Sequence, residues 1–120
     1  MKASGVEVPE EWELISFFET HPALVDQHER EFFGRLDFVR DVGGGDVLRW
    51  SVSKLGDMRI TLARDEVERV VLVARKVVRV TIERLHGVET LVALVARPPD
   101  LDRVRLTLRP TFRLEWGLEE

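Results

Sequence analysis

Three arginines near the end of the 120-residue chain have the spacing of an anion clamp. Arg105, Arg109 and Arg113 share one parity of an alternating stretch from Val104 to Trp116, so on one strand their side chains would share a face. A guanidinium group binds carboxylates and phosphates through two parallel hydrogen bonds. The row predicts a site for an anion or an acidic partner, and its ordinary alternative is a solvated sheet face.

Nucleic acid is a poor candidate for that face. Readers of RNA stack bases on exposed aromatic side chains, whereas Phe112 and Trp116 lie on the opposite, inward parity of the same stretch. We therefore predict no nucleic-acid partner. Further polar residues that the same sheet face could present are Arg79, Thr81, Arg59, Thr61, Arg49 and Ser51.

A second candidate surface is acidic and lies near the N-terminus. The net charge of −4 is concentrated there, since residues 1–60 contain twelve acidic and seven basic residues. Such a patch attracts a basic protein, mainly by speeding the encounter. The alternative is an ordinary solvated helix. The predicted partner-binding residues are Glu10, Glu11, Glu13, Glu19, Asp26 and Glu29.

Other residue types that perform chemistry lack the required pattern. The histidines His21, His28 and His86 do not have metal-ligand spacing, and the chain has no cysteine. The glycines at 43–45 are followed by neither Lys-Ser nor Lys-Thr, so they do not form a phosphate-binding loop. No serine lies near a histidine in sequence. We predict no catalytic residue, no metal site and no cofactor.

One short helix is predicted before the strands. Pro9 suits a first helical turn, and the acidic residues that follow complement the helix dipole. The helix is expected over Glu10–Thr20, ending at His21 because the residue before Pro22 avoids the α region. Its expected inward residues are Leu14, Ile15 and Phe18, with either Trp12 or Phe17.

The remainder has the alternation of strands. Residues 65–78 also match a helical stripe, but their density of β-branched valines favours a strand. Pro110 has no N–H for a sheet ladder, so the last strand is expected to be an edge strand or to contain a bulge there. The expected strands are 32–40, 48–52, 58–62, 78–83, 88–96 and 104–116, with 65–78 as a further candidate.

The dimensions of these elements constrain the fold. A sheet of six or seven strands is roughly 30 Å wide, whereas an eleven-residue helix is about 16 Å long and ~10 Å across. One helix cannot cover such a face. We predict a single α+β domain, residues 1–120, in which the short helix precedes a strongly curled, mainly antiparallel sheet of six to seven strands. A second helix at 65–78, or pairing with another subunit, would also cover the face.

The layout resembles small bacterial immunity proteins of polymorphic toxin systems. The resemblance is carried by the short acidic helix, the segment Phe-Phe-Glu-Thr-His-Pro-Ala-Leu at 17–24, strands such as Val78–Ile82 and the closing Leu106–Leu108. It covers the outline of most of the chain and transfers no functional residue, since no specific motif is shared. It implies a non-enzymatic inhibitor of one cognate toxin, and the acidic patch would suit a basic nuclease.

These observations predict a non-enzymatic protein-binding module, an immunity-type inhibitor with a basic protein partner. No apolar leader or membrane-length apolar run is visible, which predicts a cytoplasmic protein without a membrane partner. One alternative is a small-ligand or anion-binding domain that uses the curled sheet. Another is a structural homo-oligomer, for example a homodimer, sealed through residues 88–96 or the edge at Pro110.

Overall fold

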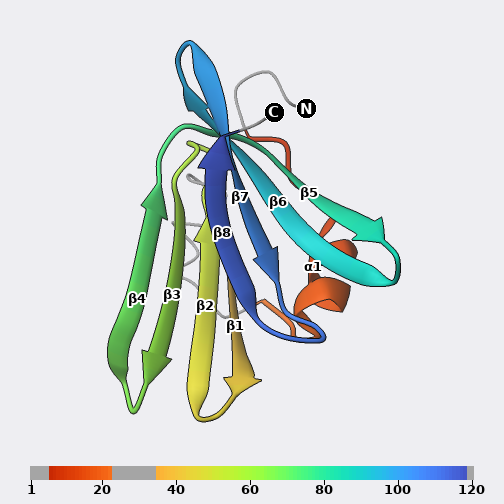
Figure 1. Ribbon diagram of the computed structural model, residues 1–120, viewed down its shortest axis with the longest axis vertical. Helices are drawn as coiled ribbons and strands as arrows, with labels where there is room; N and C mark the ends of the chain where they lie inside the picture. The colour runs from red at the N-terminus through yellow and green to blue at the C-terminus, as the bar shows by residue number, and fades with distance from the viewer. Residues whose placement is uncertain (1–5, 23–34, 119–120) are drawn as a thin grey trace.

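A computed structural model describes residues 6–22 and 35–118 of the chain. It contains one helix and eight strands, coloured from red to blue along the chain in Figure 1. The predicted strand start at Phe32 and the predicted partner-binding residues Asp26 and Glu29 lie outside the described residues. The elements are α1 (Glu11–Phe18), β1 (Leu36–Gly43), β2 (Asp46–Val52), β3 (Met58–Arg64), β4 (Val67–Ala74), β5 (Val77–Leu85), β6 (Val88–Arg97), β7 (Asp100–Thr107) and β8 (Arg113–Leu118).

The strands form two antiparallel sheets of four. The first sheet has the order β1-β2-β3-β4 and the second β5-β6-β7-β8, so within each sheet every strand pairs with the next along the chain (Figure 1). The predicted α+β class is confirmed, whereas the strongly curled sheet of six to seven strands is wrong. Splitting the strands between β4 and β5 gives each apolar face a partner, which removes the need to curl.

The described residues form eight strands rather than six to seven because one predicted strand is divided. Residues 65–78 are strand, as favoured, and the break before the next predicted strand lies at Arg75 and Lys76, which separate β4 from β5. The stretch 104–116 is two strands rather than one, because residues 108–112 turn the chain and β8 returns along β7. Pro110 lies in that turn, where its missing N–H leaves no gap in the ladder.

Helix α1 is shorter than predicted and packs on the core. At its start the backbone N–H of Glu10 donates to Oε1 of Glu13 at 3.0 Å, the carboxylate half of a capping box. The helix ends where Glu19 takes a left-handed conformation, with φ 58°. Its buried residues are Leu14, Phe17 and Phe18, while Ile15 is half-buried and Trp12 is 66% exposed.

One hydrophobic cluster joins the helix and both sheets. At its aromatic centre the ring of Phe18 stacks on Phe38, with centroids 4.9 Å apart, and lies 5.4 Å from the ring of Trp50. The second sheet contributes residues such as Leu91 and Leu106, both fully buried. The helix is too short to be stable alone, so this packing holds it in place. No helix in the described ranges is both long and apolar enough to span a membrane.

A buried carboxylate fixes the pairing of β7 with its neighbours. Asp102 is 8% exposed, and both of its oxygens accept hydrogen bonds from Nε of Arg97 at 3.0 Å. The indole Nε1–H of Trp116 donates to Oδ2 of the same carboxylate at 2.9 Å. The group is therefore both charge-paired and hydrogen-bonded, as a buried carboxylate requires.

Candidate protein interface

The outer face of the first sheet, turned away from the hydrophobic cluster, changes character from β1 to β4. One row of paired residues crosses it as Asp37, Ser51, Arg59 and Val73. Asp37 and Ser51 are buried, at 5% and 6% exposure, whereas Val73 is 43% exposed. The adjacent row is Val39, Arg49, Thr61 and Val71. The face is therefore sheltered and polar near β1, and apolar and open at β4.

Strand β4 is the most exposed apolar element of this sheet. It lies at the sheet's end, with β3 as its only strand neighbour among the described residues. Four of its valines are between 42% and 57% exposed: Val67, Val70, Val71 and Val73. Natural proteins usually protect such edges with charges, proline or a covering segment, and exposed apolar patches mark interaction sites.

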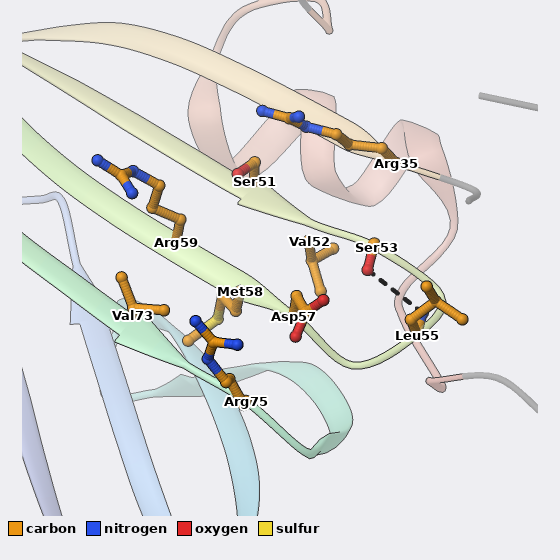
Figure 2. A pocket seen from close by; sticks show the side chains of 10 residues that line it. All are labelled: Arg35, Ser51, Val52, Ser53, Leu55, Asp57, Met58, Arg59, Val73 and Arg75. Atoms are coloured by element: carbon orange, nitrogen blue, oxygen red, sulfur yellow. Dashed lines mark hydrogen bonds between the residues drawn. The ribbon is translucent and has the colours of Figure 1, made fainter. Parts of the chain in front are cut away.

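A hollow of about 420 Å³ lies beside β4 on the same part of the sheet. Figure 2 shows Arg59 and Val73 at one end, Ser53, Leu55 and Asp57 at the other, and the guanidinium of Arg75 between them. Its remaining lining residues are Arg35, Ser51, Val52 and Met58. Among the described residues, three arginines and one carboxylate, that of Asp57, therefore line a concave surface.

Backbone hydrogen bonds fix the wall of the hollow. In the β2–β3 turn, Ser53 N–H donates to the carbonyl of Asp57 at 2.9 Å, and Gly56 N–H donates to that of Ser53 at 3.0 Å. The Gly56 carbonyl accepts from Val77 N–H at 2.9 Å, which ties this turn to the start of β5. Gly56 has φ +95°, and a Cβ there would lie 3.1 Å from the Val77 oxygen. Glycine is therefore required for this contact.

The charges around the hollow are incompletely paired. Arg35 and Arg49 approach the Asp37 carboxylate at 3.8 Å and 3.4 Å, but Asp37 Oδ1 is buried without a hydrogen bond. Arg59 lies 3.5 Å from Glu68, and both side chains are about half exposed, so that pair is weak. Arg75 has no ion-pair partner within the part of the chain that the structure describes.

A stronger pair lies across the sheet from the hollow. Arg64 Nε donates to Asp46 Oδ1 at 2.8 Å, and the two residues are direct partners of β3 and β2. This hydrogen bond, and after it the negative charge of Asp46, raise the pKa of Arg64. The pair closes the end of the β2–β3 ladder that is opposite to the β2–β3 turn.

The predicted acidic residues are largely engaged within the protein. Glu10 and Glu13 form the start of α1, with Glu11 beside them in the first turn. Glu19 lies at the other end of the helix, where it pairs with Arg40 at 3.0 Å and with Arg109. Of the predicted residues that the structure describes, three therefore lie at the start of α1 and Glu19 lies at its end. Their binding to a partner stays a prediction.

The predicted arginine row is divided by the turn between β7 and β8. Arg105 and Arg113 share the outer face of the second sheet, where Arg105 pairs in register with Glu115. Arg109 lies in the turn and pairs with Glu19 and, at 3.1 Å, with Glu89. The structure therefore brings Arg105 and Arg113 to one face and holds Arg109 against the helix.

The sequence pattern predicted only some of the residues that line the hollow. Arg59, Arg49 and Ser51 were expected on a polar sheet face, and the outer face of the first sheet carries them. Arg75 gave no signal, because it lies in a turn between two valine-rich strands. Across residues 6–22 and 35–118, no group of three or more His, Asp or Glu side chains is placed to hold a metal ion.

A solved structure shares this fold. A chain of the contact-dependent growth inhibition toxin–immunity protein complex from Klebsiella pneumoniae 342 matches with a TM-score of 0.82 at 18% sequence identity. The match covers 95% of this chain and 97% of that one. No model of a known protein family and no curated protein matches. The predicted resemblance to toxin–immunity systems is confirmed at the level of the fold.

Proposed function

We propose that the protein is an immunity-type inhibitor that binds one cognate toxin in the cytoplasm and has no enzymatic activity. The observation that carries the proposal is the likeness of nearly the whole chain to a chain of a toxin–immunity complex. The surface of the molecule adds support, because exposed valines of β4 lie beside arginines. Interfaces combine an apolar centre with enriched arginine in this way.

Co-expression with the polypeptide encoded by the neighbouring reading frame tests this function. The neighbour alone should arrest growth of the host cell, and co-expression of this chain should restore growth. The two purified proteins should also elute as one complex. If this chain arrests growth and the neighbour restores it, the roles are reversed and the inhibitor assignment is wrong. If the proteins neither form a complex nor affect growth, the proposal fails.

The hollow favours a second candidate function, the binding of a small anion. Its volume of about 420 Å³ lies within the range of small-molecule sites, and Arg35, Arg59 and Arg75 line it. A ligand that binds only the folded protein raises its melting temperature. Thermal unfolding with citrate, phosphate and sulfate tests this function. A rise with one of them that Arg75→Gln abolishes supports it, and the absence of any rise rejects it.

A further inference from the structure

The hollow of the first sheet has the chemistry of a receptor for a carboxylate side chain. Arg35, Arg59 and Arg75 line it together with Asp57, the one acidic residue of its described lining. Arg35 and Arg59 also approach the carboxylates of Asp37 and Glu68, at 3.8 Å and 3.5 Å. Arginine is suited to this role because its planar group donates two parallel hydrogen bonds to a carboxylate. Arg75 has no ion pair among the described residues, so its charge is available to a partner.

The rim of the hollow is apolar on one side. Val73 lines it, and Val71 continues the exposed surface along β4 at 46% exposure. A partner that covers these valines excludes water from the neighbouring arginines, which strengthens their attraction to a negative charge. Burial of the valines and pairing of the arginines therefore both favour a partner that carries apolar side chains next to a negative charge.

We propose that this surface docks an acidic segment of the protein partner, with one carboxylate in the hollow and apolar side chains on the valines of β4. The inference rests on the proposed function and adds the chemistry of the partner. It concerns a different surface from the acidic helix start, where a basic partner was expected. One partner can contact both the hollow and the acidic start of α1. Variants that change one surface at a time are therefore needed to measure the contribution of each surface to binding.

A protein segment fits the surface better than nucleic acid. The chain carries a net charge of −4, which repels a polyanion at long range. Binders of single-stranded nucleic acid combine a basic groove with aromatic side chains for base stacking, whereas the described residues that line this hollow include no aromatic side chain. Valines beside arginines instead provide the apolar contact area of a protein interface.

Charge reversal at Arg75 tests the proposal. The variant Arg75→Glu should fold normally, since Arg75 is exposed and makes no ion pair in the described part of the protein. Its affinity for the neighbouring-frame polypeptide, measured by calorimetry, should fall at least tenfold. The control is Leu85→Glu, which adds a negative charge at a 68% exposed side chain of the second sheet that does not line the hollow; this variant should bind within about twofold of wild type.

Two further variants keep the result interpretable. Val73→Asp adds a like charge at the rim and should weaken binding of an acidic segment, while Glu11→Lys reports on the helix surface. Melting temperatures verify the fold of each variant, and Arg75→Gln replaces Arg75→Glu if the latter unfolds. A normal affinity for a folded Arg75 variant overturns the inference while the proposed function stands. A wild-type protein that binds no partner contradicts the proposed function itself.

Competition experiments distinguish the other occupants. Citrate at millimolar concentration should displace the partner only weakly, because it lacks the apolar contacts to β4. Complete displacement by citrate would show a small-anion site instead. Displacement by a single-stranded RNA oligonucleotide at micromolar concentration would show a nucleic-acid surface. Either result would overturn the assignment to a protein segment.

Discussion

Replacement of Phe18 measures how much the short helix contributes to the fold. Phe18 is fully buried and contacts three aromatic rings: it stacks on Phe38, lies tilted against Trp50 and meets Phe17 edge-on with centroids 5.0 Å apart. Truncation of a buried phenylalanine to alanine costs about 3–5 kcal/mol, and aromatic pairs contribute roughly 0.5–1.5 kcal/mol each beyond their buried area. Phe18→Ala is therefore expected to lower the free energy of unfolding by about 4–5 kcal/mol, near the upper end of that range.

This loss is measurable by urea unfolding. A domain of this size has a free energy of unfolding of about 5–15 kcal/mol, so the variant retains some stability if the wild type lies in the upper part of that range. With an m-value of about 1.5 kcal/mol/M, a loss of about 4 kcal/mol lowers the urea midpoint by roughly 2.7 M. Far-ultraviolet circular dichroism and tryptophan fluorescence, followed together, verify that the transition is two-state.

Two further variants separate packing from helix propensity. Phe18→Leu keeps most of the apolar volume and loses the ring contacts, so its expected cost is about 1–2 kcal/mol. Trp12→Ala lies on the same helix, but Trp12 is 66% exposed, so its expected effect is within about 0.5 kcal/mol. A loss below about 1 kcal/mol for Phe18→Ala would refute the packing of α1 on the aromatic centre.

Three more substitutions test local features by the same urea assay. Gly56→Ala should destabilise by about 1–3 kcal/mol, because φ is +95° and the new Cβ would press on the carbonyl oxygen of Val77; an unchanged midpoint would contradict this contact. Trp116→Phe should cost about 1–2 kcal/mol through the lost hydrogen bond to the Asp102 carboxylate, and this part of the loss should vanish in an Asp102→Ala background, which has no acceptor for the indole N–H. Glu66→Gly should stabilise by about 0.5–1 kcal/mol, since Glu66 has φ 65° in the two-residue β3–β4 turn; a destabilised variant would exclude this turn geometry.

The hairpin of β7 and β8 shows why the alternation of residues 104–116 correctly predicted strand but did not reveal the turn that divides it into two strands. Thr107 pairs with Arg113, and Val104 with Trp116, so residue numbers of one parity share a face in both strands. The alternation therefore passes through the five-residue turn without a change of phase. Only Pro110 indicated an interruption, and it was equally consistent with an edge or a bulge.

The exposure of β4 could not be predicted from its composition. Apolar residues of both parities, such as Val70 and Val71, are typical of a strand buried on both faces. Burial depends on which elements cover a strand, and this strand ends its sheet. The hollow was hidden for a similar reason, because Arg35, Arg59 and Arg75 come from three separate segments that only the sheet brings together.

The open edge of β4 has a practical consequence for the isolated protein. Among the described residues β4 has no second strand neighbour, so its outer backbone groups and exposed valines are a template on which another extended chain can add. A valine-rich segment of this length has the composition of aggregating sequences. Concentrated samples should therefore self-associate through β4 and form thioflavin-positive fibrils on prolonged storage. Val71→Lys should delay the appearance of these fibrils.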